Sequence, residues 1–115
     1  MADDDEAGVS TDASQGTALW LGDGACAGGG ASDAAHRYST LTSKALGLVE
    51  ANHAATGVGF ATKPDVGSQV DTASKLGLAG VEYVFLMAGI TDSYDSLGSM
   101  RSATAAAVRA AAKAW

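Results

Sequence analysis

The most apolar stretch of the chain, residues 76–90, reads LGLAGVEYVFLMAGI. It holds nine of the 23 Val, Ile, Leu, Met, Phe, Tyr and Trp residues that lie between positions 31 and 115. The apolar residues before it repeat at steps of three and four, which predicts a single helix over 63–88 that becomes buried on all sides after Leu76. A strand over Val81–Met87 is the alternative, since Val, Tyr and Phe favour strands, but a lone strand would have nothing to pair with.

Two further helices are predicted on either side of this stretch. Ser32 or Asp33 can cap a helix over 33–56, whose end is marked by Gly57. Gly89 ends the central helix, and an Ala-rich helix over 92–115 follows it. We therefore predict an all-α fold, either a small three-helix bundle or a long helical hairpin, with the helical domain over residues 31–115.

Residues 1–30 are expected to form a disordered, acidic and Gly-rich leader. Of the 13 acidic residues in the chain, seven lie in positions 1–33, where there is no Lys or Arg. The net charge of −6 and the lack of clustered basic residues exclude a nucleic-acid partner. The N-terminus has the wrong charge for a secretory signal, so no signal peptide is predicted and a soluble, cytoplasmic protein is favoured.

A membrane span is not expected either. As a helix, residues 76–90 would be about 22 Å long, whereas the hydrocarbon core of a bilayer is about 30 Å thick. Glu82 also lies near the middle of the stretch, where a charge is costly.

The large apolar side chains are few for a domain of this size, because Ala supplies 25 residues and Gly another 15. A core this thin is often completed by another chain. We therefore predict a non-catalytic interaction or assembly subunit that buries its apolar helix against a protein partner or in a homo-oligomer. The candidate interface residues are Val81, Val84, Phe85, Met87 and Trp115.

A metal- or small-ligand-binding helical bundle is the alternative. Asp33 with His36, and Glu50 with His53, have the i, i+3 spacing that places two ligands on one helix face. The two pairs would be about 25 Å apart on one helix and could not share an ion. His36, Glu50 and His53 are therefore weak candidate ligands, and no cofactor is predicted.

The sequence gives little support for catalysis. Cys26 is the single cysteine, and no G-x-S-x-G or Ser-x-x-Lys pattern is present. Residues 22–27 match the loose G-x-G-x-x-A form of a dinucleotide-binding loop, but no β-α-β pattern is evident around them, which favours a flexible linker. The chain is accordingly not expected to be an enzyme.

A third functional hypothesis comes from a family resemblance. Trp20-Leu21-Gly22 is a W-x-G tripeptide, and the Ala-rich helix ending at Trp115 resembles the second helix of small type VII secretion substrates of actinobacteria. In that family the W-x-G lies between two long helices, whereas no helix-length segment precedes Trp20 here, and the family's Tyr-x-x-x-acid signal is absent. The resemblance covers about 25 residues and implies a secreted helical substrate with a partner chain.

Overall fold

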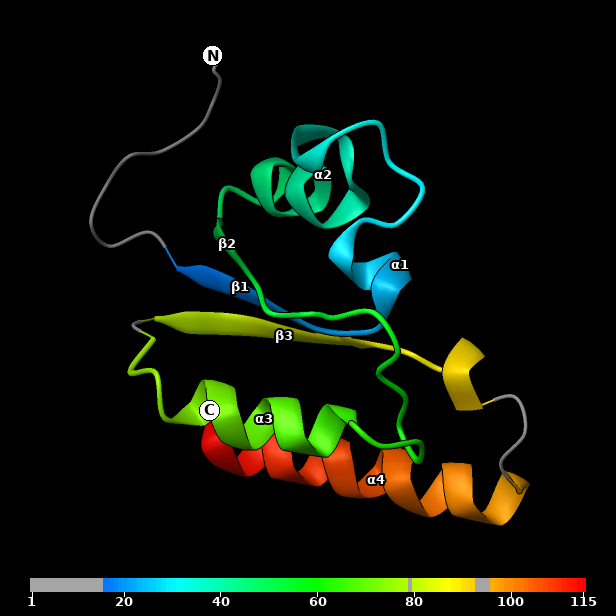
Figure 1. Ribbon diagram of the computed structural model, residues 1–115. Helices are drawn as coiled ribbons and strands as arrows, with labels where there is room; N and C mark the ends of the chain where they lie inside the picture. The colour runs from blue at the N-terminus through cyan, green and yellow to red at the C-terminus, as the bar shows by residue number, and fades with distance from the viewer. Residues whose placement is uncertain (1–15, 79, 93–95) are drawn as a thin grey trace.

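The predicted all-α fold is wrong: the protein is an α/β domain with a three-stranded parallel sheet (Figure 1). The computed structural model describes residues 16–78, 80–92 and 96–115. The strands are β1 (Thr17–Gly22), β2 (Val49–Asn52) and β3 (Val81–Met87), in the order β2-β1-β3. The helices are α1 (Gly24–Ala27), α2 (Tyr38–Ala45), α3 (Val66–Ser74) and α4 (Leu97–Ala114), with short 3₁₀ turns at Ala34–His36 and Ile90–Asp92.

The central strand β1 decides this architecture. It lies within residues 1–30, which were assigned to the leader, and its residues 18–21 are buried. Side chains alternate along a strand, so Leu19 and Leu21 face one layer of the domain while Ala18 and Trp20 face the other. Strands that are buried on both faces are typical of parallel sheets with helices on either side.

Within the stretch 76–90, residues Val81–Met87 form a strand because β1 is available to pair with them. α3 ends at Ser74, and Gly77 and Gly80 then turn the chain with positive φ angles of 66° and 61°. β3 follows, parallel to β1, with Leu19 beside Val84 and Leu21 beside Leu86. The predicted helix over 63–88 is therefore a helix, a turn and a strand.

The predicted helix over 33–56 is divided in the same way. α2 ends at Ala45, and Gly47, with a φ of 69°, turns the chain into β2. Of the three predicted helices, only the C-terminal one corresponds to a single observed helix, α4, which lies inside the range 92–115.

Helices cover both faces of the sheet, as Figure 1 shows: α1 and α2 lie on one side, and α3 and α4 on the other. Leu19 and Leu21 pack with buried residues of α3 and α4 such as Val70 and Ala107. Trp20 packs with Cys26 of α1 and with Phe85. In the described residues, no helix is both long enough and apolar enough to cross a membrane.

Candidate functional site

The direction of the strand order changes at β1. From β1 the chain passes to β2 at one edge of the sheet, and then crosses to β3 at the other edge. In open parallel sheets, ligands bind outside the carboxyl ends of the strands at such a switch point. The loops that follow β1, β2 and β3 are therefore the first place to look for a site.

The turn after β1 is held tightly in place. The Asp23 carboxylate caps α1 by accepting from the amides of Ala25 and Cys26, and the Asp23 amide donates to the Met87 carbonyl. A Cβ on Gly22 would overlap that same carbonyl oxygen. Residues 22–27, predicted from the sequence to be a linker, thus form the strand–turn–helix that a dinucleotide loop would need. However, α1 has only four residues, ends at Ala27 and is capped by Gly28.

Gln69 of α3 connects the ends of β1 and β2. Its side-chain Nε2 donates to the carbonyl of Gly22 at 3.0 Å and to the carbonyl of His53 at 3.2 Å. These two acceptors fix the orientation of the amide, because a flipped side chain would place its oxygen against two carbonyl oxygens. In the described part of the chain, Gln69 Oε1 is the buried side-chain polar atom that lacks a hydrogen-bond partner.

Gln69 lines a cavity of about 360 Å³ between α3 and the segment that follows β2. Apolar atoms form much of its wall, and the polar side chains His53, Ser68 and Thr72 also line it. The remaining lining residues are Ala55, Val58, Pro64, Asp65, Ala73 and Leu76. Both the size and the mainly apolar wall with a few polar groups are typical of small-molecule sites.

Asp65 fixes the cavity wall at the start of α3. Its carboxylate accepts from the amide and hydroxyl of Ser68 and forms an ion pair with Lys63. Burial alone would raise the pKa of Asp65, but the Lys63 ammonium and the Ser68 donors outweigh it and lower the pKa to about 2. The carboxylate is therefore ionised at neutral pH and already paired.

Asp92, in the 3₁₀ turn Ile90–Asp92 that follows β3, holds the loop that precedes Asp65. Its side chain is fully buried, and its two oxygens accept from the amides of Phe60, Ala61 and Thr62 at 2.6, 3.0 and 2.8 Å. Burial would raise the pKa of Asp92, yet these amides outweigh it and lower the pKa. Asp92 thus ties the end of β3 to the loop that carries Pro64 and Asp65.

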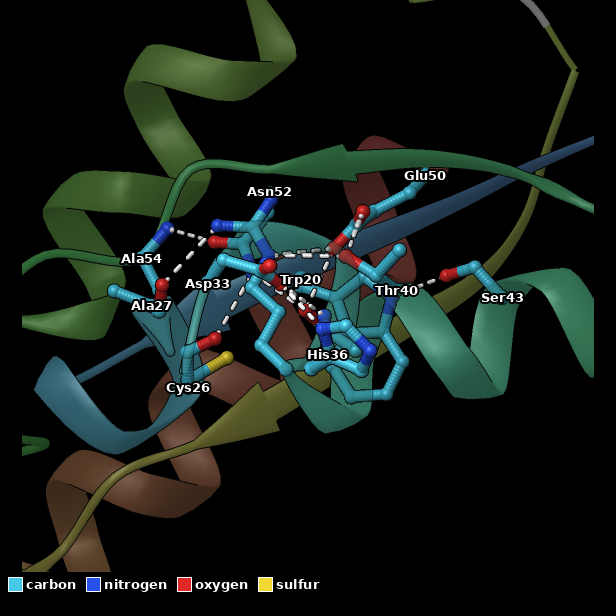
Figure 2. A network of polar contacts seen from close by, with 12 residues as sticks. Trp20, Cys26, Ala27, Asp33, His36, Thr40, Ser43, Glu50, Asn52 and Ala54 are labelled. Carbon is cyan, nitrogen blue, oxygen red and sulfur yellow. Dashed lines mark hydrogen bonds and ion pairs between the residues drawn. The ribbon is translucent and has the colours of Figure 1, made fainter. Parts of the chain in front are cut away.

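The three weak candidate metal ligands, His36, Glu50 and His53, lie in different parts of the structure. Glu50 accepts from Ser39 and Thr40 and pairs with Arg37 in a polar network between α2 and β2 (Figure 2). His36 pairs with Asp33 at 2.6 Å on the exposed turn before α2, whereas His53 lines the cavity. Among the described residues, no group of three or more His, Cys, Asp or Glu side chains is placed to hold a metal ion.

The same network ties the layer of α1 and α2 to the sheet. Asn52 donates to the Ser39 hydroxyl and to the Cys26 carbonyl, and Trp20 Nε1 donates to Ser43 Oγ at 2.9 Å (Figure 2). Burial is the main reason that the pKa of the Cys26 thiol is raised to about 11, so little of the reactive thiolate is present at neutral pH.

The candidate interface residues lie mostly on β3. Val81, Val84, Phe85 and Met87 belong to this strand at one edge of the sheet, and Trp115 follows α4 and packs against the core. Side chains alternate along the strand. On one face Phe85 stacks on Trp20 and on Tyr83, and Met87 accepts from the Tyr38 hydroxyl, whereas Val84 and Leu86 face α4.

Gln69, Asp65 and Asp92 were not predicted from the sequence as site residues. The predicted helix over 63–88 begins close to the observed start of α3 at Val66, but a helix start does not reveal a cavity beside it. Gln69 bonds to Gly22, which lies 47 positions earlier, and Asp92 bonds to Phe60, which lies about 30 positions earlier. The local sequence carries no signal for contacts over such separations.

No protein-family model, curated protein or solved structure matches the chain. Trp20-Leu21-Gly22, the tripeptide behind the resemblance to type VII secretion substrates, lies in β1 and not between two helices.

Proposed function

We propose that the domain binds a small neutral molecule in the cavity beside Gln69, through an apolar body and one N–H or O–H donor. The observation that carries this proposal is the Gln69 side chain, which lines the cavity, has its amide held in one orientation and has a buried Oε1 that lacks a donor. An unsatisfied buried acceptor costs about 1–3 kcal/mol, so a ligand donor that reaches it gains a matched hydrogen bond.

The wall of the cavity indicates the rest of the ligand. Ala55, Val58, Pro64 and Leu76 offer contact to an apolar group. Asp65, the carboxylate on the wall, is already paired with Lys63 and Ser68, so it provides no free charge to attract a cation. A primary amide on an aromatic ring has the required chemistry.

Two probes of nearly equal size test this proposal. Benzamide has an N–H donor, whereas methyl benzoate has acceptors and no N–H or O–H. In ¹H–¹⁵N correlation spectra, we expect benzamide to shift the amides of His53, Ser68 and Gln69 with a Kd in the millimolar range, typical of so small a ligand. Methyl benzoate should bind at least about tenfold more weakly, since one matched hydrogen bond is worth about 1.4 kcal/mol.

A pair of variants on the exposed side of α3 locates the binding. Thr72→Leu enlarges a side chain that lines the cavity and should abolish the benzamide shifts. Ser74→Leu makes a similar change away from the cavity wall and should leave them unchanged. Equal binding of both probes, or benzamide shifts that persist in Thr72→Leu, would contradict the proposed site.

An interaction or assembly role is a second candidate function. It is supported by the edge of β3, which has no neighbouring strand among the described residues and where Tyr83 is 51% and Met87 41% exposed. We propose binding rather than catalysis for both sites.

A further inference from the structure

β3 is incompletely covered at its strand edge and on both of its faces. β3 is an edge strand, so half of its backbone groups have no neighbouring strand in the described part of the chain. On the face shared with α1 and α2, Tyr83 and Met87 remain exposed. On the other face, a cavity of about 410 Å³ lies between β3 and α4, lined by Val84, Leu86, Val108, Ala111 and Ala112.

We propose that this side binds β3 of a second copy of the chain, with the two strands antiparallel about a twofold axis through Phe85. An isologous interface of this kind requires a strand that complements itself. In this register Tyr83 lies opposite Met87 of the second copy, Phe85 opposite Phe85, and Val84 opposite Leu86. Every pair is apolar, and cross-strand pairs of aromatic and aliphatic side chains stabilise antiparallel sheets.

The position of Glu82 fits this register. The pairing of β1 with β3 shifts between Thr17 and Ala18, so Glu82 lies at an irregularity and residues 83–87 form the regular part of the strand. A register centred on Phe85 uses those five residues and leaves Glu82 opposite Ala88, at the rim of the interface. The carboxylate is exposed and can stay in water.

The other sheet edge is less suitable for self-association. β2 is four residues long, and its Glu50 side chain is occupied by Arg37, Ser39 and Thr40. Val49 is 50% exposed there, which makes it a matched position for a control substitution.

The exposed area predicts a weak dimer. A large side chain has about 150–250 Å² of surface, and Tyr83, Met87 and Val108 are 51%, 41% and 53% exposed. With the strand backbone and the half-buried neighbours, each copy would bury about 500 Å², or roughly 1,000 Å² in total, which is the lower limit for a specific interface. We therefore expect a Kd of roughly 10 µM.

Sedimentation velocity on the full chain between about 1 and 200 µM tests the proposal. The mass should rise from 11.4 kDa toward twice that value as the concentration increases. Tyr83→Lys, which places a charge against the partner's apolar strand, should stay monomeric at the highest concentration, whereas Val49→Lys on the opposite edge should dimerise like the wild type. A monomeric wild type, a dimeric Tyr83→Lys variant, or dimerisation lost in Val49→Lys would each overturn it.

Hydrogen exchange of the wild type gives a second test that needs no variant. Exchange is compared at about 5 µM and about 200 µM, which lie on either side of a Kd of roughly 10 µM. Dimerisation through β3 should slow exchange at the higher concentration for those amides of residues 83–87 that do not bond to β1. The amides of β2 should exchange at the same rate at both concentrations. Slowing confined to β2, or no change on either strand, would refute the proposed interface.

Discussion

Replacing Asp92 by alanine should destabilise the domain by about 3 kcal/mol. The substitution removes the acceptors of three backbone amides, and hydrogen bonds to a charged group each contribute about 1.5 kcal/mol or more. The sum is reduced because the three amides belong to half-buried residues that water can reach once the carboxylate is gone. Against a total stability of about 5–15 kcal/mol, the loss is large but leaves a folded protein to study.

Urea denaturation at pH 7, followed by far-UV circular dichroism, measures the loss of stability. Hydrogen exchange shows where stability is lost. The amides of Phe60, Ala61 and Thr62 should exchange faster than in the wild type, whereas the amides of β1 should exchange faster only as far as the global stability falls. Because the loop also carries Pro64 of the cavity wall, benzamide binding should weaken in parallel.

Asp92→Asn is the matched control. Its single acceptor oxygen can keep the bonds that Oδ1 now receives from Ala61 and Thr62, whereas the new amino group faces the Phe60 amide. We expect a loss of about 1–2 kcal/mol, between wild type and alanine. If Asp92→Ala lost less than about 1 kcal/mol, with unchanged exchange at 60–62, the reasoning that Asp92 holds this loop would be refuted.

Three further predictions follow from close contacts elsewhere. Ser43→Ala leaves the buried Trp20 Nε1 without an acceptor and should lower the free energy of unfolding by about 1–3 kcal/mol, measured by urea denaturation; a neutral change would contradict it. Gly22→Ala places a methyl group on the Met87 carbonyl and should cost about 1–3 kcal/mol, detectable as a lower melting temperature, and an unchanged melting temperature would argue against this close approach. The pKa of Asp65 is depressed to about 2, so its stabilising interactions are complete above about pH 4 and are lost as the pH falls toward 2. Asp65→Asn should therefore flatten the fall in the free energy of unfolding over that pH range, and a pH profile identical to that of the wild type would exclude the contribution.

Local sequence rules placed one helix start and one helix end close to the observed ones. The predicted helix over 63–88 starts within a few residues of α3, which Asp65 caps, and the Ala-rich segment predicted as a helix over 92–115 is helical from Leu97 to Ala114. Capping and helix propensity act within one or two turns of chain, so they can be recognised without knowledge of the fold.

The identity of residues 81–87 as a strand could not be decided in this way. A short apolar run fits a buried helix or a buried strand equally well, and the choice depends on whether another strand lies beside it. That strand is β1, about 60 residues earlier, and the acidic and Gly-rich composition around it is typical of a disordered leader.

The candidate site was decided by tertiary structure for the same reason. The sequence determined by itself where charges, caps and apolar runs lie, because these depend on near neighbours. Only the fold brings Gln69 to the carbonyls of Gly22 and His53, and Asp92 to the amides of residues 60–62. Long-range hydrogen bonds arise from the packing of whole elements, and no local pattern encodes their partners.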